Sequence, residues 1–66
     1  MIIKNKKYVI ISNDYPLKFY TGDGCLDDFF EESVLYESEE RANGELSTFD
    51  KPENFRIVEV NITYEF

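Results

Sequence analysis

The sequence has no histidine and no tryptophan, and its only cysteine is Cys25. Without an imidazole, hydrolytic sites that use histidine as the general base are excluded, and the one thiol has no histidine to activate it. A single cysteine forms no internal disulfide, and no cluster of thiolates or imidazoles is present for zinc. We therefore expect no enzyme and no cofactor, and a reducing cytoplasm in which Cys25 packs as a small, half-buried hydrophobic residue.

The sequence also lacks a long hydrophobic run, because residues 8–11 are the longest uninterrupted apolar stretch. This stretch is too short for a membrane span or for the apolar part of a signal peptide, so we expect a soluble protein without membrane contact. At 42% hydrophobic and 17% aromatic, the 66 residues are predicted to form a single folded domain over 1–66. A domain of this size buries only about 60% of its unfolded surface, so a thin core is expected.

Positive charge is scarce and unevenly placed. Seven Lys and Arg face fourteen Asp and Glu, for a net charge of −7. Residues 1–22 carry +3, whereas residues 23–45, the acidic block, carry −8 and include only one cation, Arg41. The carboxylates of the block are Asp23, Asp27, Asp28, Glu31, Glu32, Glu37, Glu39, Glu40 and Glu45. Because phosphate contacts need Lys and Arg, this charge opposes direct nucleic-acid binding, and Lys4, Lys6 and Lys7 are expected to protect a strand edge.

Alternation of apolar and polar residues predicts strands at both ends of the chain. From Val58 to Phe66 every second residue is apolar, which predicts a strand over about 55–65 with one buried face. Residues 7–12 and 17–21 flank the turn signature Asn13-Asp14-Tyr15-Pro16 and are predicted to form a hairpin. Residues 2 and 3 either extend its first strand or form a separate short one.

The middle of the chain is predicted to contain one helix. Ser38, followed by two glutamates, is a typical helix start, and Ala42, Leu46 and Phe49 then share one face, although Gly44 weakens the helix. Residues 23–32 fit an acidic loop or a short helical turn; we favour the loop, with a short strand over 33–37. The predicted fold is α+β, a small antiparallel sheet of three or four strands with one helix packed on it, in the order β-β-(β)-α-β.

This order resembles small accessory proteins encoded by phages and prophages. The resemblance lies in a leading KYVI at residues 7–10, LYESEERA at residues 35–42 and a closing IVEV at residues 57–60, and Gly44 departs from the uninterrupted helix of such proteins. It implies a phage origin and interference with a host enzyme or defence system by direct binding, and it supplies no functional residues.

Two kinds of chemistry remain for the acidic block. A dedicated calcium site is not expected, because the spacing after Asp23 places Gly and Leu where an EF-hand requires other residues. The carboxylates either form a solvated face or dock into the basic groove of a nucleic-acid-handling protein, with aromatic anchors among them. The predicted partner-binding residues are Asp23, Asp27, Asp28, Phe29, Phe30, Glu31, Glu32 and Tyr36.

The apolar C-terminal strand predicts self-association. It carries Ile62, Tyr64 and Phe66 without a polar residue after them, and an apolar strand of this kind should be covered. We expect a homodimer through these three residues. The sequence thus favours a cytoplasmic, non-enzymatic, phage-encoded inhibitor of a host protein; the alternative is a structural or assembly accessory protein whose acidity serves only solubility.

Overall fold

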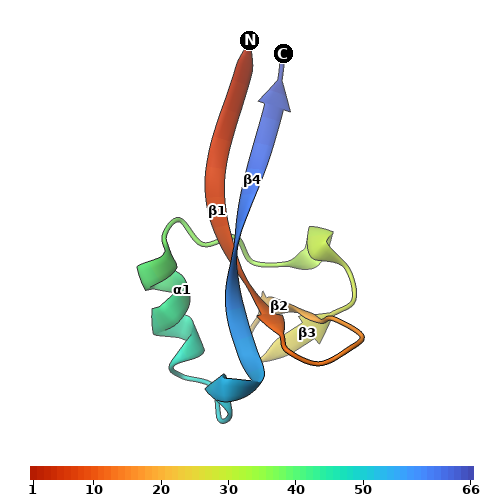
Figure 1. Cartoon of the computed structure of the whole chain (residues 1–66), viewed down its shortest axis with the longest axis vertical. Coiled ribbons are helices and arrows are strands. Elements are labelled where there is room, and N and C mark those ends of the chain that lie inside the picture. Colours follow the sequence, from red (N-terminus) through yellow and green to blue (C-terminus); the bar gives the residue numbers. More distant parts are fainter.

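Two eleven-residue strands, β1 (Ile2–Ser12) and β4 (Phe55–Glu65), run antiparallel along the whole length of the molecule. The computed structural model describes all 66 residues and is shown in Figure 1. The strands pair without interruption from Ile2 opposite Glu65 to Ser12 opposite Phe55. The predicted C-terminal strand is confirmed, and residues 2 and 3 extend the first strand rather than forming a separate one.

The remaining strands are short. Strands β2 (Phe19–Gly22) and β3 (Cys25–Asp27) complete a four-stranded antiparallel sheet in the order β3-β2-β1-β4. Helix α1 (Glu39–Leu46) packs on this sheet, and single turns of 3-10 helix, η1 (Phe30–Glu32) and η2 (Pro52–Asn54), precede α1 and β4. The predicted α+β class is therefore confirmed, as is the order β-β-(β)-α-β.

The prediction of the third strand was wrong in its position. It lies at Cys25–Asp27, inside the segment expected to be a loop, and residues 33–37 form only one isolated bridge, between Tyr36 and Tyr8. The backbone of Tyr8 exchanges hydrogen bonds of 3.0 and 2.8 Å with that of Tyr36. Phe19 of β2 pairs with Ile11 on the same edge of β1, and Tyr36 adds a single bridge beyond it at Tyr8.

The turn Gly22-Asp23-Gly24 explains the β2–β3 hairpin. All three residues have positive φ, +98°, +53° and +75°, a conformation that glycine adopts freely and aspartate tolerates. An Asp-Gly pair in such a turn matches the twist of the flanking strands, so the chain reverses there.

Helix α1 covers one face of the sheet. The Oγ of Ser38 accepts a hydrogen bond from the Arg41 amide at 3.2 Å, which confirms the predicted helix start. Ala42, fully buried, contacts Ile10 of β1 and Tyr20 of β2 in the central cluster. Partly buried residues surround this cluster: Tyr8, Tyr36, Leu46, Phe49, Phe55 and Ile57. The helix ends at Leu46, so Phe49 reaches the same cluster from the following segment.

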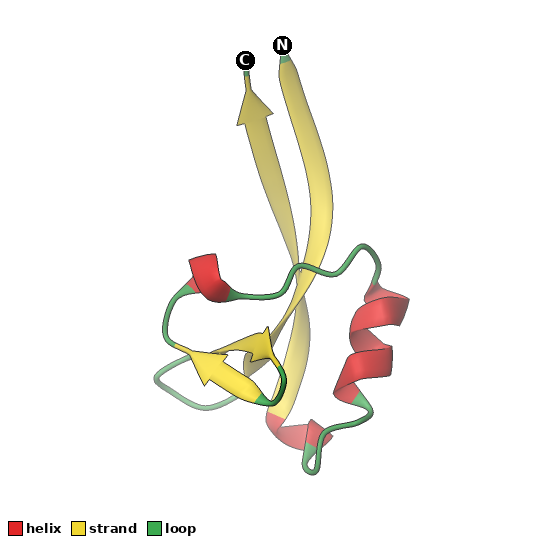
Figure 2. Ribbon diagram, turned by 180° about the vertical axis from the view of Figure 1, so that it is seen from behind, coloured by secondary structure: helices red, strands yellow, loops and turns green.

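The opposite face is covered by a different segment. Val9 and Ile11 point away from Ile10 because side chains alternate along a strand, and both are buried. Phe19 pairs with Ile11, and its ring meets that of Phe30 edge-on with 5.8 Å between the ring centroids. Segment 28–36, which contains η1, therefore covers this side, and Figure 2 shows η1 and α1 on opposite sides of the long strands.

The far half of β1 and β4 stands alone. Residues 2–7 and 60–65, which we call the arm, project from the rest of the molecule as a two-stranded ribbon, and Figure 1 shows neither helix nor other strand beside it. The molecule measures 42 Å along this direction and 24 by 18 Å across it. No helix of the structure is long and apolar enough to cross a membrane.

Candidate functional site

The acidic turn, residues 27–32, forms a well-defined projection after β3. The Oδ1 of Asp27 accepts a hydrogen bond from the Phe29 amide at 3.0 Å, and the Oγ of Ser33 donates to the Phe30 carbonyl at 2.6 Å. The ring of Phe30 packs on Phe19, whereas the ring of Phe29 is 65% exposed. The local hydrogen bonds thus hold one aromatic ring against the sheet and its neighbour out in solvent.

Three exposed carboxylates lie within three residues of Phe29 in the sequence. Glu31 and Glu32 of η1 are exposed, and Asp28 is exposed beside Phe29. Asp28 forms an ion pair with Lys18, and no ion pair forms at Glu31 or Glu32. Nowhere in the structure do three acidic side chains converge as the ligands of a metal ion. The acidic turn is therefore an array of separated negative charges around an exposed phenyl ring.

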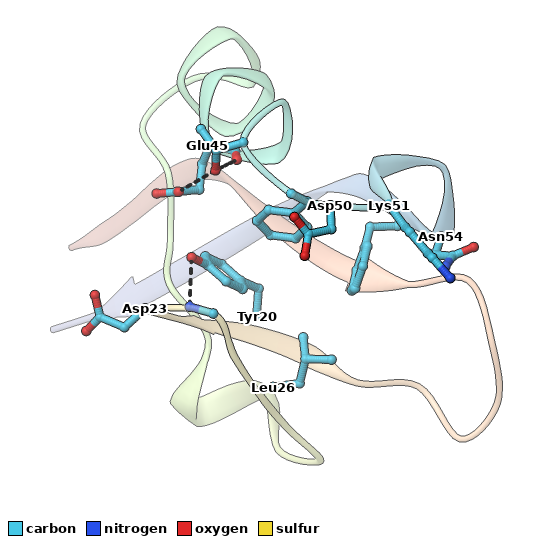
Figure 3. A pocket seen from close by; sticks show the side chains of 11 residues that line it. Tyr20, Asp23, Leu26, Glu45, Asp50, Lys51 and Asn54 are labelled. Atoms are coloured by element: carbon cyan, nitrogen blue, oxygen red, sulfur yellow. Dashed lines mark hydrogen bonds between the residues drawn. The ribbon is translucent and has the colours of Figure 1, made fainter.

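Asp23 lies apart from these residues. It occupies the β2–β3 turn, and β3 separates it from Asp28, a distance of about 10 Å at the rise of a strand. Asp23 instead borders an open hollow of about 720 Å³ between this turn and the segment that follows α1 (Figure 3).

The hollow has an aromatic floor and an acidic rim. The rings of Tyr20, Phe49 and Phe55 line it, and the Tyr20 hydroxyl accepts a hydrogen bond from the Gly24 amide at 3.3 Å. The remaining lining residues are Asp23, Gly24, Leu26, Glu45, Thr48, Asp50, Lys51 and Asn54. Three carboxylates against one lysine give the rim a negative charge, which suits a basic side chain above the rings.

The sequence did not reveal this hollow, because it joins segments more than 20 residues apart. Its signals, the Asp-Gly pair at residues 23 and 24 and Asp50 next to Phe49, are separately typical of turns. Only the packing of Phe49 against Tyr20 at 4.8 Å and against Phe55 at 5.0 Å, measured between ring centroids, brings them together.

Tyr36 is not part of the exposed array. It pairs with Tyr8 and contacts the central hydrophobic cluster, where burial raises the pKa of its hydroxyl to about 12, with a further contribution from the nearby Glu45 carboxylate.

The prediction that Cys25 is half-buried was wrong. Cys25 lies exposed on β3, because β3 is the edge strand of the sheet.

The residues expected to mediate self-association all lie on the arm or at its end. Tyr64 is 46% exposed and Phe66 80% exposed, whereas Ile62 is half-buried. They share one face of β4, since they are two residues apart. The structure thus places the predicted dimer residues apart from the acidic turn, while Asp23 and Tyr36, predicted to bind the partner, lie outside that turn.

Comparison with protein-family models, with curated protein sequences and with solved structures gave no match to this chain.

Proposed function

We propose that this protein is a non-enzymatic, phage-encoded inhibitor that binds a basic surface of a host protein through its acidic turn. The observation that carries the proposal is the exposed ring of Phe29 among the carboxylates of Asp28, Glu31 and Glu32. Interfaces concentrate their binding energy in a few aromatic residues that become desolvated, with charged residues at the rim. The acidic turn has this arrangement, and its hydrogen bonds fix it before binding.

The charge of the molecule supports a basic partner. The acidic block carries −8 and the rest of the chain +1, which gives the net charge of −7. This charge produces a field that attracts a positively charged surface and accelerates encounter. A protein that handles nucleic acids presents such a surface in its phosphate-binding groove. The hollow beside Asp23 offers a second contact, in which a lysine or arginine side chain of the partner lies over the half-buried rings of Phe49 and Phe55.

Affinity purification from host lysate with variants of equal charge tests this proposal. In one variant Glu31→Lys and Glu32→Lys reverse two charges of the acidic turn. In the matched control Asp14→Lys and Glu53→Lys reverse two exposed charges elsewhere, at residues whose side chains make no hydrogen bond or ion pair. A third variant, Phe29→Ala, removes the exposed ring without changing the charge.

We expect the wild type and the control to retain the same host protein at low salt, and the first and third variants to lose it. Retention should also fall from 50 to 500 mM NaCl, because salt screens charge at distances beyond roughly 5–10 Å. Equal loss from both charge-reversal variants would show that only total charge matters, as expected for the alternative of an assembly protein whose acidity serves solubility. Capture unaffected by all three variants would rule out the acidic turn as the binding surface.

A further inference from the structure

The arm is amphipathic, with one apolar and one polar face. Antiparallel partners share a face, so Ile3 lies beside Tyr64, and Lys7 beside Val60. The apolar face consists of Ile3, Asn5, Lys7, Val60, Ile62 and Tyr64. The polar face consists of Ile2, Lys4, Lys6, Asn61, Thr63 and Glu65. Lys7 is the only charged residue of the apolar face, and its Nζ donates to the Glu37 carboxylate at 2.6 Å, which neutralises it.

The apolar face of the arm continues the buried face of the sheet. Val9 and Ile11 belong to the same face and are only 1% and 5% exposed. Segment 28–36 lies on this side, where Phe30 packs on Phe19, the β2 partner of Ile11. That cover ends where Tyr36 pairs with Tyr8, and beyond it the exposed fraction rises to 40% at Ile3 and 46% at Tyr64. This face of β1 and β4 is therefore covered over one half of its length and exposed over the other half.

An open ribbon of this kind is a weak structure by itself. A two-stranded antiparallel ribbon in water is at best marginally stable, and a hydrophobic face must be packed to hold it. The exposed apolar area lies mainly toward the end of the arm, where Ile3 and Tyr64 are 40% and 46% exposed and the adjoining pair Met1 and Phe66 are 81% and 80% exposed. Because Ile3 and Tyr64 are already about half covered within one copy, the face offers less area than the roughly 800 Å² per partner of a standard interface. It thus has the composition of a small apolar interface.

We propose that a second copy of this chain covers the apolar face of the arm. The two arms pack face to face about a two-fold axis near Ile62, so that Tyr64 of one copy lies over Val60 of the other, and both polar faces stay in solvent. This is a self-complementary interface, in which the same residues are contributed by each copy. The proposal does not depend on the function of the acidic turn.

The distribution of charge selects this arrangement. Two copies with a net charge of −7 each repel one another, and the acidic block is the main source of that repulsion. The arm contains three lysines and one glutamate, but Lys4 and Lys6 lie on its polar face and Lys7 is paired with Glu37, so two arms meet at the apolar face without unpaired like charges between them. With the arms antiparallel, the two acidic blocks lie at opposite ends of an assembly longer than the 42 Å of one chain, well beyond the roughly 8 Å screening length at physiological salt.

Neighbouring residues of β4 provide a matched test, because their side chains point to opposite faces. In the first variant Ile62→Glu and Tyr64→Glu place two charges on the apolar face. In the control Asn61→Glu and Thr63→Glu place the same two charges on the polar face of the same strand, opposite Lys6 and Lys4, so the arm itself is not destabilised. Sedimentation equilibrium between 1 and 200 µM measures the mass of each, and the chain mass is 7.8 kDa. Amide signals of Val9, Ile10 and Ala42 in NMR spectra report whether the body remains folded.

We expect the wild type and the control to reach about twice the chain mass, and the first variant to remain at the chain mass with the signals of its body retained. Two buried glutamates at an interface centre should weaken the dimer by at least about 30-fold, the factor that corresponds to a loss of 2 kcal/mol at a hot spot. Wild-type protein at the chain mass throughout, or equal dissociation of both variants, would overturn the proposal.

A second measurement keeps the test decisive if the first variant unfolds, and it separates face-to-face packing from edge pairing. With the two-fold axis near Ile62, the Val60 positions of the two copies are offset by four residues along the strands, roughly 13 Å, and Asn61 points to the polar face, so neither can form a disulfide between copies. Strands paired at their edges instead bring Cα atoms to about 4.5–5.5 Å. We therefore expect Val60→Cys and Asn61→Cys, each with Cys25→Ser, to form the dimer under mild oxidation without a disulfide between copies. Efficient cross-linking at either position would show that the β4 edges pair and would overturn the face-to-face interface.

Discussion

Tyr36 belongs to the acidic block in the sequence but packs against the hydrophobic core in the structure. The carbonyl and amide of Tyr8 fix its backbone, and its side chain contacts the central cluster rather than solvent. Burial is the largest cause of its raised pKa, and the Glu45 carboxylate adds to it because a negative charge nearby disfavours a second one. Its hydroxyl is therefore held neutral by the fold.

This shift predicts a loss of stability at high pH. The pKa of Tyr36 rises from 10.0 in the unfolded chain to about 12 in the folded protein. Between these values the unfolded chain has released the proton and the folded protein retains it, so the free energy of unfolding is unaffected below pH 10 and falls as the pH rises toward 12. Urea unfolding at pH 8, 10 and 11.5 measures this. Tyr36→Phe should remove much of the fall, whereas Tyr15→Phe, at a tyrosine that is 84% exposed, should not.

At the level of elements, helix α1 depends on its first residue. The helix has only eight residues and includes Gly44, so its intrinsic stability is low. The Ser38 hydroxyl satisfies the Arg41 amide, and Glu39 and Glu40 lie at the positive end of the helix dipole. Two of the nine carboxylates of the acidic block thus have a structural role in starting the helix.

Removing the cap should destabilise the whole domain, since Ala42 is fully buried only when α1 is formed. We expect Ser38→Ala to lower the free energy of unfolding by about 1 kcal/mol, whereas Ser38→Asp keeps an acceptor for the Arg41 amide and stays within a few tenths of the wild type. Chemical unfolding followed by circular dichroism measures both. An alanine variant as stable as the wild type would show that the cap contributes nothing.

At the level of the whole molecule, separation of charge is the dominant feature. Only three ion pairs form, all of them between solvent-exposed or partly exposed side chains, and such pairs contribute about 0–1 kcal/mol each. They do not offset the repulsion among the remaining carboxylates. The arm and the acidic turn lie on different parts of an elongated molecule, so the two proposed contacts, with a second copy and with a basic partner, would use separate surfaces.

This imbalance predicts that salt stabilises the protein. Screening weakens the repulsion among excess acids more than it weakens three exposed pairs, so the melting temperature should rise between 10 and 300 mM NaCl. Glu31→Lys with Glu32→Lys changes the net charge by +4, from −7 to −3, and should reduce this rise. Calorimetry at a fixed protein concentration makes the comparison, because the proposed dimer would also shift the melting temperature. A melting temperature that falls with salt would show that the ion pairs dominate.

The sequence by itself determined the elements that depend on local pattern. Alternation over 55–65, the turn at residues 13–16 and the Ser38 cap predicted β4, the first hairpin and the start of α1, because side-chain period, turn chemistry and capping act within a few residues. It also determined the excess of acid. It misplaced the third strand, since Cys25–Asp27 is a strand through its pairing with β2 across the Asp23-Gly24 turn, whereas residues 33–37 meet β1 at only one bridge.

Only the tertiary structure decided what each charged or apolar residue faces. In the folded protein, carboxylates of the acidic block lie at three places: the start of α1, the rim of the hollow and the acidic turn. They are apart because β3 and α1 separate them in space. The tertiary structure also showed that the apolar face of β1 and β4 is covered up to Tyr36 and open beyond it. Period and composition fix which face of a strand is apolar, but the cover of that face comes from segments distant in the chain, and their positions follow from packing alone.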